Sequence, residues 1–338
     1  MHILVTGGCG YIGVHTVYSL VSQGYSVVVL DNFSNSTIES LRRVESMTGQ
    51  KITFYEGDSC CEQTLDNIFS NNNISAVIHF AGLKSISESI QKPVEYYLNN
   101  VSGTLTLLKC MIKNNVNNFI FSSSATVYGK PTSYPIKEST SIGGTTNPYG
   151  SSKLFMELML NDISQAHEQL KVTILRYFNP IGAHESGNIG EQPNGIPNNL
   201  MPYLTQVAIG TLPYLNVYGF DYPTHDGTGV RDYIHVMDLA EAHVQALSKI
   251  SCSDGLQIYN LGTGKGYSVL EIINAFESVT GIKIPYKLKP RRKGDIAECW
   301  SDSSKADIEL GWKAKRGIFE MIRDAWKWQS DNPNGYGK

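Results

Sequence analysis

The first 180 residues of the chain alternate short apolar runs with longer segments that can form helices. The runs are rich in β-branched residues and lie at His2–Thr6, Ser26–Leu30, Lys51–Glu56, Ala76–Phe80, Asn118–Ser122 and Val172–Phe178. Short, continuous apolar strands separated by helices are typical of a parallel sheet that helices cover on both faces. The sequence therefore predicts a Rossmann-type, doubly wound α/β domain over residues 1–180.

After Pro180 the pattern changes. Gly182–Pro202, rich in Gly, Asn and Pro, and the glycine-rich Tyr218–Gly229 are expected to form long loops of the kind that line sites in compact enzymes. Helices are expected near Asp238–Lys249, Val269–Thr280 and Phe319–Gln329. We interpret residues 181–338 as a smaller, mixed α/β lobe over the carboxyl edge of the sheet, with Gln257–Leu261 adding a strand to the first sheet.

Composition excludes several classes of function. The 338 residues carry 28 Lys and Arg against 31 Asp and Glu, so the net charge is −3 and indicates neither a nucleic-acid nor an anionic-membrane partner. No apolar run approaches the roughly 18 residues that a membrane span needs, and we expect no secretory signal. The six cysteines and eight histidines show neither C-x-x-C nor H-E-x-x-H spacing, so we expect a reduced, cytoplasmic protein without a metal site.

A glycine-rich turn, residues 6–13, follows the first predicted strand and precedes a segment that can form a helix. G-x-G-x-x-G is a weak signal by itself, but in this context glycines let a pyrophosphate approach the backbone and a helix N-terminus. Asp31 ends the second strand, 18 residues after Gly13, where a carboxylate accepts hydrogen bonds from the adenosine ribose and repels a 2′-phosphate. The pattern predicts an NAD site whose glycine-loop residues are Gly7, Gly10, Tyr11, Ile12 and Gly13.

Three later positions are placed to meet the same cofactor. Asp58 follows the third strand, near the expected adenine, although an aspartate in a plain turn has the same spacing. Phe80 and Ala81 end the fourth strand beside Gly82, where small residues permit a close approach. Lys84 follows and suits a phosphate, with a solvated lysine as the alternative.

A second pattern suits acid–base chemistry. A helix is predicted to start at Asn147, a natural N-cap, with Pro148 in the first helical position, so Tyr149 and Lys153 lie one turn apart. A free tyrosine has a pKa of about 10, but a nearby ammonium and a cationic nicotinamide favour the phenolate, so we expect a lowered pKa. Such pairs also occur by chance on helix surfaces. Ser124, at the end of the fifth strand, supports the catalytic interpretation because ligands bind at that edge of open α/β sheets.

These motifs resemble those of the extended short-chain dehydrogenase/reductase family of sugar-nucleotide enzymes, over nearly the whole chain. The residues that carry the resemblance are Thr6–Gly13, Asp31–Asn32, His79–Lys84, Tyr97–Thr104, Ser122–Gly129, Tyr149–Lys153, Arg176–Gly182, Gly195–Pro202, Thr228–Leu239, Tyr259–Gly264 and Pro290–Asp295. The resemblance implies NAD-dependent 4-epimerisation of UDP-hexoses by transient oxidation at C4, rotation of the 4-keto sugar and re-reduction. It also implies a tightly bound NAD and a homodimer.

The resemblance assigns roles to individual residues. Tyr149 would take the proton of the sugar 4-hydroxyl, Ser124 would relay it, and Lys153 would bind the nicotinamide ribose. Further positions that match cofactor contacts are Asn32, Asn99 and Phe178. Further positions that match UDP-sugar contacts are Asn179, Asn199, Leu200, Asn216, Tyr218, Arg231, Arg292 and Asp295. Arg231 and Arg292 are implied to hold the diphosphate, which suits a guanidinium fork, with a solvated basic turn as the alternative for Arg292.

Position 299 departs from the family pattern. Relatives that act only on glucose and galactose usually carry tyrosine there, whereas this chain has Cys299. A thiol is much smaller than a phenol ring, so we expect a wider sugar pocket that accepts UDP-GlcNAc and UDP-GalNAc beside UDP-Glc and UDP-Gal. The alternative is that another side chain fills the space.

Three other functions compete with epimerisation. Nucleotide-sugar 4,6-dehydratases usually carry Asp-Glu directly after the position of Ser124, but here Ala125 and Thr126 offer no carboxylate for acid–base work. A simple NAD-dependent dehydrogenase remains an alternative. A non-catalytic NAD sensor is disfavoured because Tyr149, Lys153 and Ser124 are all present.

Overall fold

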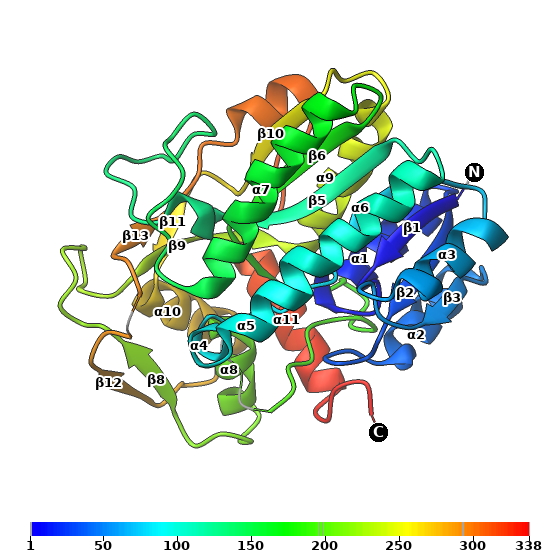
Figure 1. Ribbon diagram of the computed structural model, residues 1–338. Coiled ribbons are helices and arrows are strands. Elements are labelled where there is room, and N and C mark those ends of the chain that lie inside the picture. The colour runs from blue at the N-terminus through cyan, green and yellow to red at the C-terminus, as the bar shows by residue number, and fades with distance from the viewer. Residues whose placement is uncertain (1, 196, 198, 293, 338) are drawn as a thin grey trace.

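The computed structural model describes residues 2–195, 197, 199–292 and 294–337. Its centre is a seven-stranded parallel sheet in the order β10-β6-β5-β4-β1-β2-β3 (Figure 1). The strands are β1 (His2–Thr6), β2 (Ser26–Asp31), β3 (Thr53–Glu56), β4 (Ile74–His79), β5 (Asn118–Ser124), β6 (Lys171–Tyr177) and β10 (Leu256–Leu261). The predicted fold class is confirmed, and the six strands predicted before residue 180 lie within two residues of their predicted bounds.

Successive residues of each strand pack on opposite faces of this sheet, since side chains alternate along a strand. In β1, Ile3 and Val5 belong to one buried apolar cluster and Leu4 to another. The helices over the first face are α1 (Tyr11–Ser22), α2 (Ile38–Thr48) and α9 (Val236–Ile250). Those over the second face are α3 (Glu62–Asn71), α6 (Gly103–Lys113) and α7 (Pro148–Ala166). Both faces are therefore covered, as the continuous apolar strands require.

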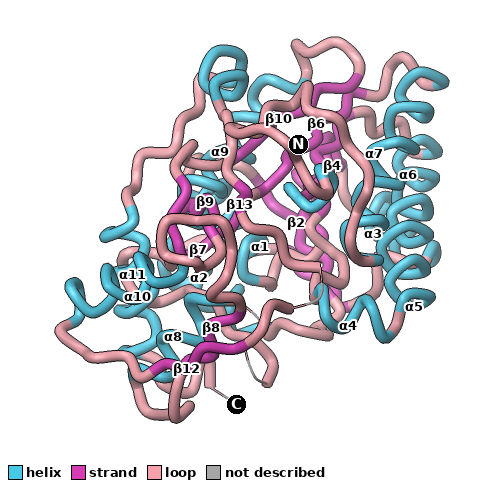
Figure 2. The backbone as a smooth tube through the Cα atoms, turned by 90° about the vertical axis from the view of Figure 1, so that its left-hand side faces the viewer, coloured by secondary structure: helices cyan, strands magenta, loops and turns pink. Residues whose placement is uncertain are grey.

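The smaller lobe is built around β9 (Val230–His235), which pairs with three short strands: β7 (Asn179–Ile181), β11 (Gly266–Ser268) and β13 (Glu298–Cys299). A separate pair, β8 (Leu215–Tyr218) and β12 (Tyr286–Lys289), lies apart from the large sheet (Figure 2). The remaining elements of the lobe are α8 (Leu200–Ala208), α10 (Val269–Thr280), the π-helical turn η3 (Ala306–Leu310) and α11 (Ile318–Asp331). β10 leaves the lobe to join the large sheet beside β6. The division into two domains at residue 180 stays a prediction.

One expected loop ends earlier than predicted. The stretch Gly182–Pro202 was expected to be loop throughout, but α8 starts at Leu200. Pro202 lies in the first helical turn, where a missing N–H costs nothing. Met201 and Leu204 are buried in the core of the lobe, so tertiary packing extends the helix back over residues whose composition suggested a loop.

The structure bears on two further features, membrane-spanning helices and metal sites. In the part of the chain that the structure describes, no helix is long and apolar enough to cross a bilayer. Within the same residues, no group of His, Cys, Asp and Glu side chains is arranged to hold a metal ion.

Candidate active site

The glycine loop between β1 and α1 has no room for a side chain at two positions. Gly7 has a φ of +69°, and a Cβ there would lie 2.7 Å from the backbone nitrogen of Ala81. A Cβ on Gly13 would lie 2.2 Å from the carbonyl oxygen of Gly7. No side chain caps the N-terminus of α1, at Gly10. The loop therefore presents backbone and a helix N-terminus, which fits the pyrophosphate of a dinucleotide.

The first residues of α1 connect this loop to the smaller lobe. The Tyr11 hydroxyl donates a hydrogen bond to the carbonyl oxygen of Gly182 at 2.7 Å. Ile12 packs against the core cluster that also contains Phe80. The start of the long loop after β7 is thereby attached to the helix that would face the cofactor.

The Asp31 carboxylate, at the end of β2, is hydrogen-bonded both to the glycine loop and to the turn that follows β2. Its Oδ2 accepts a hydrogen bond from the backbone N–H of Cys9 at 2.9 Å. Its Oδ1 accepts from the N–H of Phe33 at 3.0 Å and from the Ser36 hydroxyl at 2.7 Å. These bonds hold the carboxylate at the carboxyl edge of the sheet, beside the loop. Its contact with a ribose stays a prediction.

Asn32 and Asp58 lie together at the ends of β2 and β3. The Asn32 amide donates to Oδ2 of Asp58 at 3.2 Å, and the backbone N–H of Cys60 donates to Oδ1 at 2.7 Å. Burial acts to raise the pKa of Asp58, but these hydrogen bonds outweigh it and lower the pKa. Asp58 is therefore an ionised acceptor at the position predicted for the adenine.

The end of β4 lies against the glycine loop. The N–H groups of Phe80 and Ala81 donate to the carbonyl oxygen of Thr6 at 3.0 and 3.2 Å. Asn99 belongs to the π-helical turn η1 (Leu98–Ser102), and its amide donates to Oδ1 of Asn100 at 2.9 Å. Asn100 also accepts from the backbone that follows β4, which brings η1 to the same edge of the sheet.

The start of α7 is as predicted. Asn147 caps the helix, since its Oδ1 accepts from the N–H of Gly150 at 2.9 Å, and Pro148 is the first helical residue. The cap places Tyr149 in the first turn, at the end of the helix nearest Ser124. Ser124 in turn caps the 3-10 helix η2 (Ala125–Tyr128).

Tyr149 and Lys153 both contact the end of β5. The Lys153 ammonium donates to the carbonyl oxygen of Ser122 at 2.7 Å and lies 4.8 Å from the centre of the Phe121 ring. The Ser124 hydroxyl is close enough to Tyr149 to lower the pKa of its phenol. The structure thus brings the three predicted catalytic residues together at the carboxyl edge, beside the glycine loop of the same sheet.

The pKa of Tyr149 does not follow the sequence argument. We expected the Lys153 ammonium and a cationic nicotinamide together to lower it, but in the protein without nucleotide desolvation of the hydroxyl raises the pKa, and the Ser124 hydroxyl only partly compensates. Burial also lowers the pKa of Lys153 to about 8, against an upward contribution from Glu157. The prediction fails for the protein by itself because desolvation acts on both groups and favours their neutral forms.

Cys299 and Arg231 are partners in neighbouring strands. They are paired residues of β13 and β9, and Cys299 is buried in a small cluster that also contains Phe178. The Arg231 guanidinium donates to the carbonyl oxygens of Ile296 and Ala297 at 2.9 and 3.3 Å. The cation is therefore held in place by backbone rather than by a carboxylate.

Tyr134 packs against the cluster of Cys299 and is a candidate for filling the space that a tyrosine at position 299 would occupy. Its hydroxyl donates to the carbonyl oxygen of Glu298 at 2.8 Å, and its ring stacks on Trp300 at 6.0 Å between centroids. These contacts hold the Tyr134 ring beside the strand that carries Cys299.

The predicted uridine-diphosphate residues form a second group. Arg292 pairs with Asp295 at 2.9 Å, and its guanidinium lies 5.1 Å from the centre of the Tyr218 ring. The Asn216 amide donates to the Tyr203 hydroxyl at 3.2 Å, while its buried Oδ1 has no hydrogen-bond partner among the described residues. Lys293, in the basic turn that carries part of the resemblance, lies outside the described residues.

Glu191, which the sequence did not single out, contacts one residue predicted for the cofactor site and one predicted for the substrate site. Glu191 forms an ion pair with Lys84 at 3.7 Å and accepts from the Asn199 amide at 3.1 Å. Asn199 is the N-cap of α8 and Leu200 its first residue. Asn179 begins β7, the strand beside β9. No local pattern points to Glu191, because its partners are more than a hundred residues away or lie across a loop.

Two further buried residues were missed although a signal existed. Glu157 lies one helical turn after Lys153 and two after Tyr149, so helical spacing places it on the same face. It forms a buried ion pair with Arg176 on β6 at 2.6 Å. Arg176 lies in an apolar strand, where a lone charge requires a partner.

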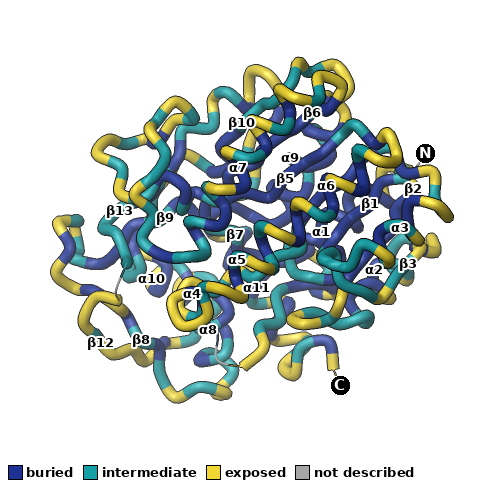
Figure 3. Tube along the Cα trace, viewed as in Figure 1, coloured by how far each residue is buried: buried dark blue, intermediate teal, exposed yellow. Residues whose placement is uncertain are grey.

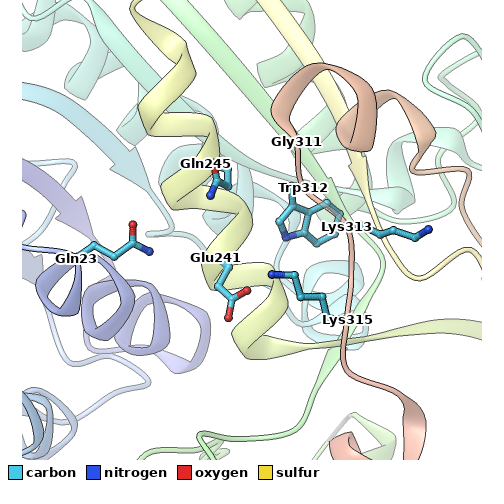
Figure 4. Close-up of a pocket in the computed structure, with 7 residues that line it drawn as sticks. All are labelled: Gln23, Glu241, Gln245, Gly311, Trp312, Lys313 and Lys315. Carbon is cyan, nitrogen blue, oxygen red and sulfur yellow. The ribbon is translucent and has the colours of Figure 1, made fainter.

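A hollow of about 360 Å³ is lined by none of these residues. Figure 4 shows the side chains that line it. It is lined by the end of α1 at Gln23, by α9 at Glu241 and by residues 311–315. α1 starts at the carboxyl edge of the sheet, so its end lies at the amino edge. Glu241 already pairs with Arg316 at 2.8 Å, and the Trp312 indole N–H donates to the carbonyl oxygen of Asp238. The hollow therefore does not form part of the candidate site.

Comparison with known proteins places the whole chain among nucleotide-sugar enzymes. Residues 4–325 match the protein family described as GDP-mannose 4,6 dehydratase. A UDP-glucose 4-epimerase of Pasteurella multocida is 60% identical over 336 residues, which are 99% of each chain.

Solved structures are similar over the same length. The UDP-glucose 4-epimerase of Bifidobacterium longum, solved in complex with NAD+ and UDP, is 55% identical with a TM-score of 0.97, over 99% of this chain and 100% of that one. The enzyme of Stenotrophomonas maltophila, solved with bound NAD and formylated UDP-arabinopyranose, is 47% identical with a TM-score of 0.96, over 98% of this chain and 99% of that one.

Proposed function

Because this chain belongs to the UDP-glucose 4-epimerase family, within the extended short-chain dehydrogenases/reductases, we propose that it interconverts UDP-glucose and UDP-galactose with NAD as cofactor. One observation in the structure carries the proposal. Tyr149, Ser124 and Lys153 meet at the carboxyl edge of the sheet that also bears the glycine loop and Asp31. This arrangement puts an acid–base group beside a dinucleotide site.

Tyr149 is the proposed acid and base. As phenolate it accepts the proton of the sugar 4-hydroxyl, and it returns a proton when the 4-keto sugar is reduced again. Ser124, next to Tyr149, orients the 4-hydroxyl and relays the proton. Since burial raises the pKa of Tyr149 in the protein by itself, the phenolate requires positive charge nearby.

NAD, when bound, supplies the acceptor and donor of the hydride at C4 and adds a positive charge near Tyr149. The glycine loop and the uncapped N-terminus of α1 fit its pyrophosphate, because the loop packs too tightly for side chains at Gly7 and Gly13 and presents backbone N–H groups instead. Asp31 would hold the adenosine ribose and Lys153 the nicotinamide ribose. The remaining residues proposed for the cofactor site are Gly10, Tyr11, Ile12, Asn32, Asp58, Phe80, Ala81, Lys84, Asn99 and Phe178.

The UDP-sugar is proposed to lie between the sheet edge and the smaller lobe. Arg231 and Arg292 would bind the diphosphate, and Asp295 a ribose hydroxyl. The Arg292 side chain is half exposed, so its ion pair with Asp295 costs little to exchange for a phosphate. The buried, unpartnered Oδ1 of Asn216 suits a donor on the uracil. Asn179, Asn199, Leu200 and Tyr218 complete the proposed substrate site.

The description of the matching family as a dehydratase does not favour dehydration here. Expelling water from a sugar requires an acid and a base at the reacting carbons. The two positions after Ser124 are Ala125 and Thr126, and neither is a carboxylic acid. Ala125 is also buried in the apolar cluster that contains Cys299, and its methyl group cannot transfer a proton.

The proposal is tested by incubating the purified protein with UDP-galactose and no added NAD, and following the anomeric protons by NMR. We expect conversion to UDP-glucose. A 4-keto-6-deoxy product would indicate a dehydratase instead. Oxidation that proceeds only with added NAD would indicate a simple dehydrogenase, and no reaction in a preparation shown to contain NAD would indicate a sensor.

Replacing Asp31 by Asn is expected to weaken NAD binding by about 10- to 100-fold, because a hydrogen bond to a charged acceptor is worth about 1.5–3 kcal/mol. Repulsion of a 2′-phosphate also falls, so discrimination against NADP decreases. Calorimetric titration of the cofactor-free protein with each nucleotide measures both effects. Asp162→Asn, the same change at an exposed carboxylate on α7, is the control. An unchanged ratio of the two dissociation constants in the Asp31 variant contradicts the assigned role.

N-acetylated substrates are a finer part of the proposal. Cys299 leaves more room near the sugar than tyrosine would, and its cluster is lined by apolar groups that suit an acetyl methyl. We therefore expect UDP-GlcNAc and UDP-GalNAc to be interconverted as well. Tyr134 is the side chain whose position bears on this expectation.

We further propose that the chain forms a homodimer through one apolar surface. Within the described residues, seven of the thirteen exposed large hydrophobic side chains lie on α4 (Ile86–Gln91), α5 (Pro93–Tyr97), η1, α6 and α7, which are neighbours in space (Figure 3). The seven are Ile86, Ile90, Val94, Leu98, Leu105, Phe155 and Leu158. A patch of this kind on a water-exposed face favours an interface, and a second copy supplies a self-complementary surface.

Replacing Phe155, a residue of this surface that is 42% exposed, by Glu is expected to yield a monomer. The added charge would be buried without a partner at the interface, which association does not tolerate. Sedimentation velocity measures the change in mass. Ile308→Glu, at a more exposed apolar residue outside the surface, should leave the dimer intact. A wild-type protein that sediments as a monomer would refute the dimer.

A further inference from the structure

The buried ion pair of Glu157 and Arg176 joins α7 to β6, one helical turn beyond Lys153. Glu157 Oε2 lies 2.6 Å from Nη2 of Arg176, and each side chain is 2% exposed. Nε of Arg176 donates to both carboxylate oxygens, at 3.0 and 3.2 Å. Burying two charges costs several kcal/mol per ion, and such a pair is often no more stabilising than apolar residues of the same size. Stability by itself is therefore a weak reason for its presence.

The pair belongs to a ladder of contacts between α7 and the end of β5. Tyr149, Lys153 and Glu157 follow one another at one-turn intervals, so they lie on one face of the helix. Each contacts a different one of three consecutive serines. Tyr149 faces Ser124, the Lys153 ammonium donates to the carbonyl oxygen of Ser122 at 2.7 Å, and Glu157 Oε1 accepts from the Ser123 hydroxyl at 2.5 Å.

Arg176 extends this ladder to the turn after Ser124. Its Nη1 donates to the Tyr128 hydroxyl at 2.8 Å, and the guanidinium lies 4.8 Å from the centre of that ring. Tyr128 ends η2, the short helix that Ser124 caps, and its hydroxyl donates to Asn260 on β10 at 2.6 Å. The ion pair is therefore attached both to the helix that carries Tyr149 and Lys153 and to the turn that carries Ser124.

We propose that Glu157, held by Arg176, is a positioning residue for the epimerase reaction: it sets the register of α7 on β5, and thereby the places of Tyr149 and Lys153 opposite Ser124. The inference rests on the proposed function, because it assigns Glu157 a task only in a reaction that uses these three residues. Glu157 does not contact the reacting atoms. The sugar and the cofactor are bound by other residues.

Glu157 also acts on the charge of Lys153. Burial lowers the pKa of Lys153 to about 8, and the Glu157 carboxylate is the group that raises it against this effect. The other titratable groups that face Lys153 are Tyr149 on α7 and His79 on β4, whose own pKa is lowered to about 3, so it is neutral near pH 7. Removing the Glu157 charge would therefore shift the loss of the Lys153 proton to lower pH.

The first test is Glu157→Gln, measured as kcat and KM for UDP-galactose from pH 6 to pH 10. We expect kcat to fall about 10- to 100-fold, the cost typical of a small misplacement of catalytic groups, with KM changed less than about twofold. The alkaline limb of the kcat profile is expected to move to lower pH. Asp162→Asn, which removes an exposed carboxylate from the same helix, is the matched control and should change neither quantity.

A second variant separates positioning from stability, because Glu157→Gln leaves Arg176 buried without its partner. In the double variant Glu157→Met, Arg176→Met both charges are replaced by apolar side chains, a change that often preserves stability. If the pair is merely structural, this folded variant regains wild-type kcat and the wild-type alkaline limb, and the inference is overturned. We expect it to fold, bind NAD and remain slow.

The two proposals fail in distinguishable ways. A wild-type protein that does not epimerise UDP-galactose contradicts the proposed function, and the role of Glu157 with it. A wild-type protein that is active, with a Glu157→Gln variant whose kcat and pH profile are unchanged, contradicts only the role of Glu157.

Discussion

Replacing Tyr149 by Phe is expected to lower kcat for UDP-galactose about 10³-fold, within the range that a positioned acid–base group contributes. Phenylalanine keeps the ring but removes the hydroxyl that Ser124 contacts. No other group in the ladder replaces it, since Lys153 bonds to the carbonyl oxygen of Ser122 and Glu157 is paired with Arg176. KM should change little, because the residues proposed to bind the diphosphate and uridine do not include Tyr149.

The measurement is a time course of UDP-galactose conversion at enzyme concentrations high enough to detect slow turnover. NAD released on denaturation is quantified in the same samples, so that a lost cofactor is not mistaken for a lost acid–base group. Tyr25→Phe, remote from the site at the start of β2, is the matched control. A Tyr149→Phe variant with wild-type kcat would show that a different residue transfers the proton.

Replacing Cys299 by Tyr should change specificity more than rate. We expect turnover of UDP-GlcNAc to fall at least about 100-fold, while turnover of UDP-galactose stays within about threefold. The physical reason is steric, because a phenol ring at this position would occupy the space of the N-acetyl group and create a clash against one substrate only. Cys299 is 9% exposed within a packed cluster, so a larger side chain has few directions available besides the pocket.

NMR of each substrate with the wild type and the variant measures the ratio of rates directly. Cys299→Ser, which keeps the size, is the control and should retain both activities. Equal loss of both activities in Cys299→Tyr would refute the specificity argument. A wild-type protein that converts UDP-galactose but not UDP-GlcNAc would indicate that Tyr134 already fills the space, which Tyr134→Ala then tests.

Local patterns were sufficient for the sheet and for the cofactor loop. The apolar runs predicted the strands because a buried parallel strand has no polar face, and this property is present in consecutive residues. The glycine loop was also predictable, because its pattern lies in consecutive residues, 6–13. The close approach of Gly13 to Gly7 is a contact between residues six apart, so sequence order already determines it.

Contacts between distant segments were not predictable in this way. Glu191 meets Lys84, and Arg176 meets Glu157, because packing brings separate elements together, and no local spacing encodes either pair. Arg292 and Asp295 were both assigned to the substrate, but nothing indicated that they pair with each other in the protein. The start of α8 at Leu200 depended likewise on a core assembled from other helices.

The protonation of the candidate catalytic residues separates most clearly what the sequence determines from what the tertiary structure decides. The sequence by itself determined which groups stand one turn apart, Tyr149 and Lys153, because helix geometry converts spacing into a shared face. It predicted that Lys153 and a bound nicotinamide lower the pKa of Tyr149, whereas burial raises this pKa in the protein without nucleotide. An ionisable group keeps or loses its charge according to how much water the fold removes from around it, and according to the dipoles and charges that replace this water. Both depend on segments that are distant in the sequence, so only the packed structure decides them.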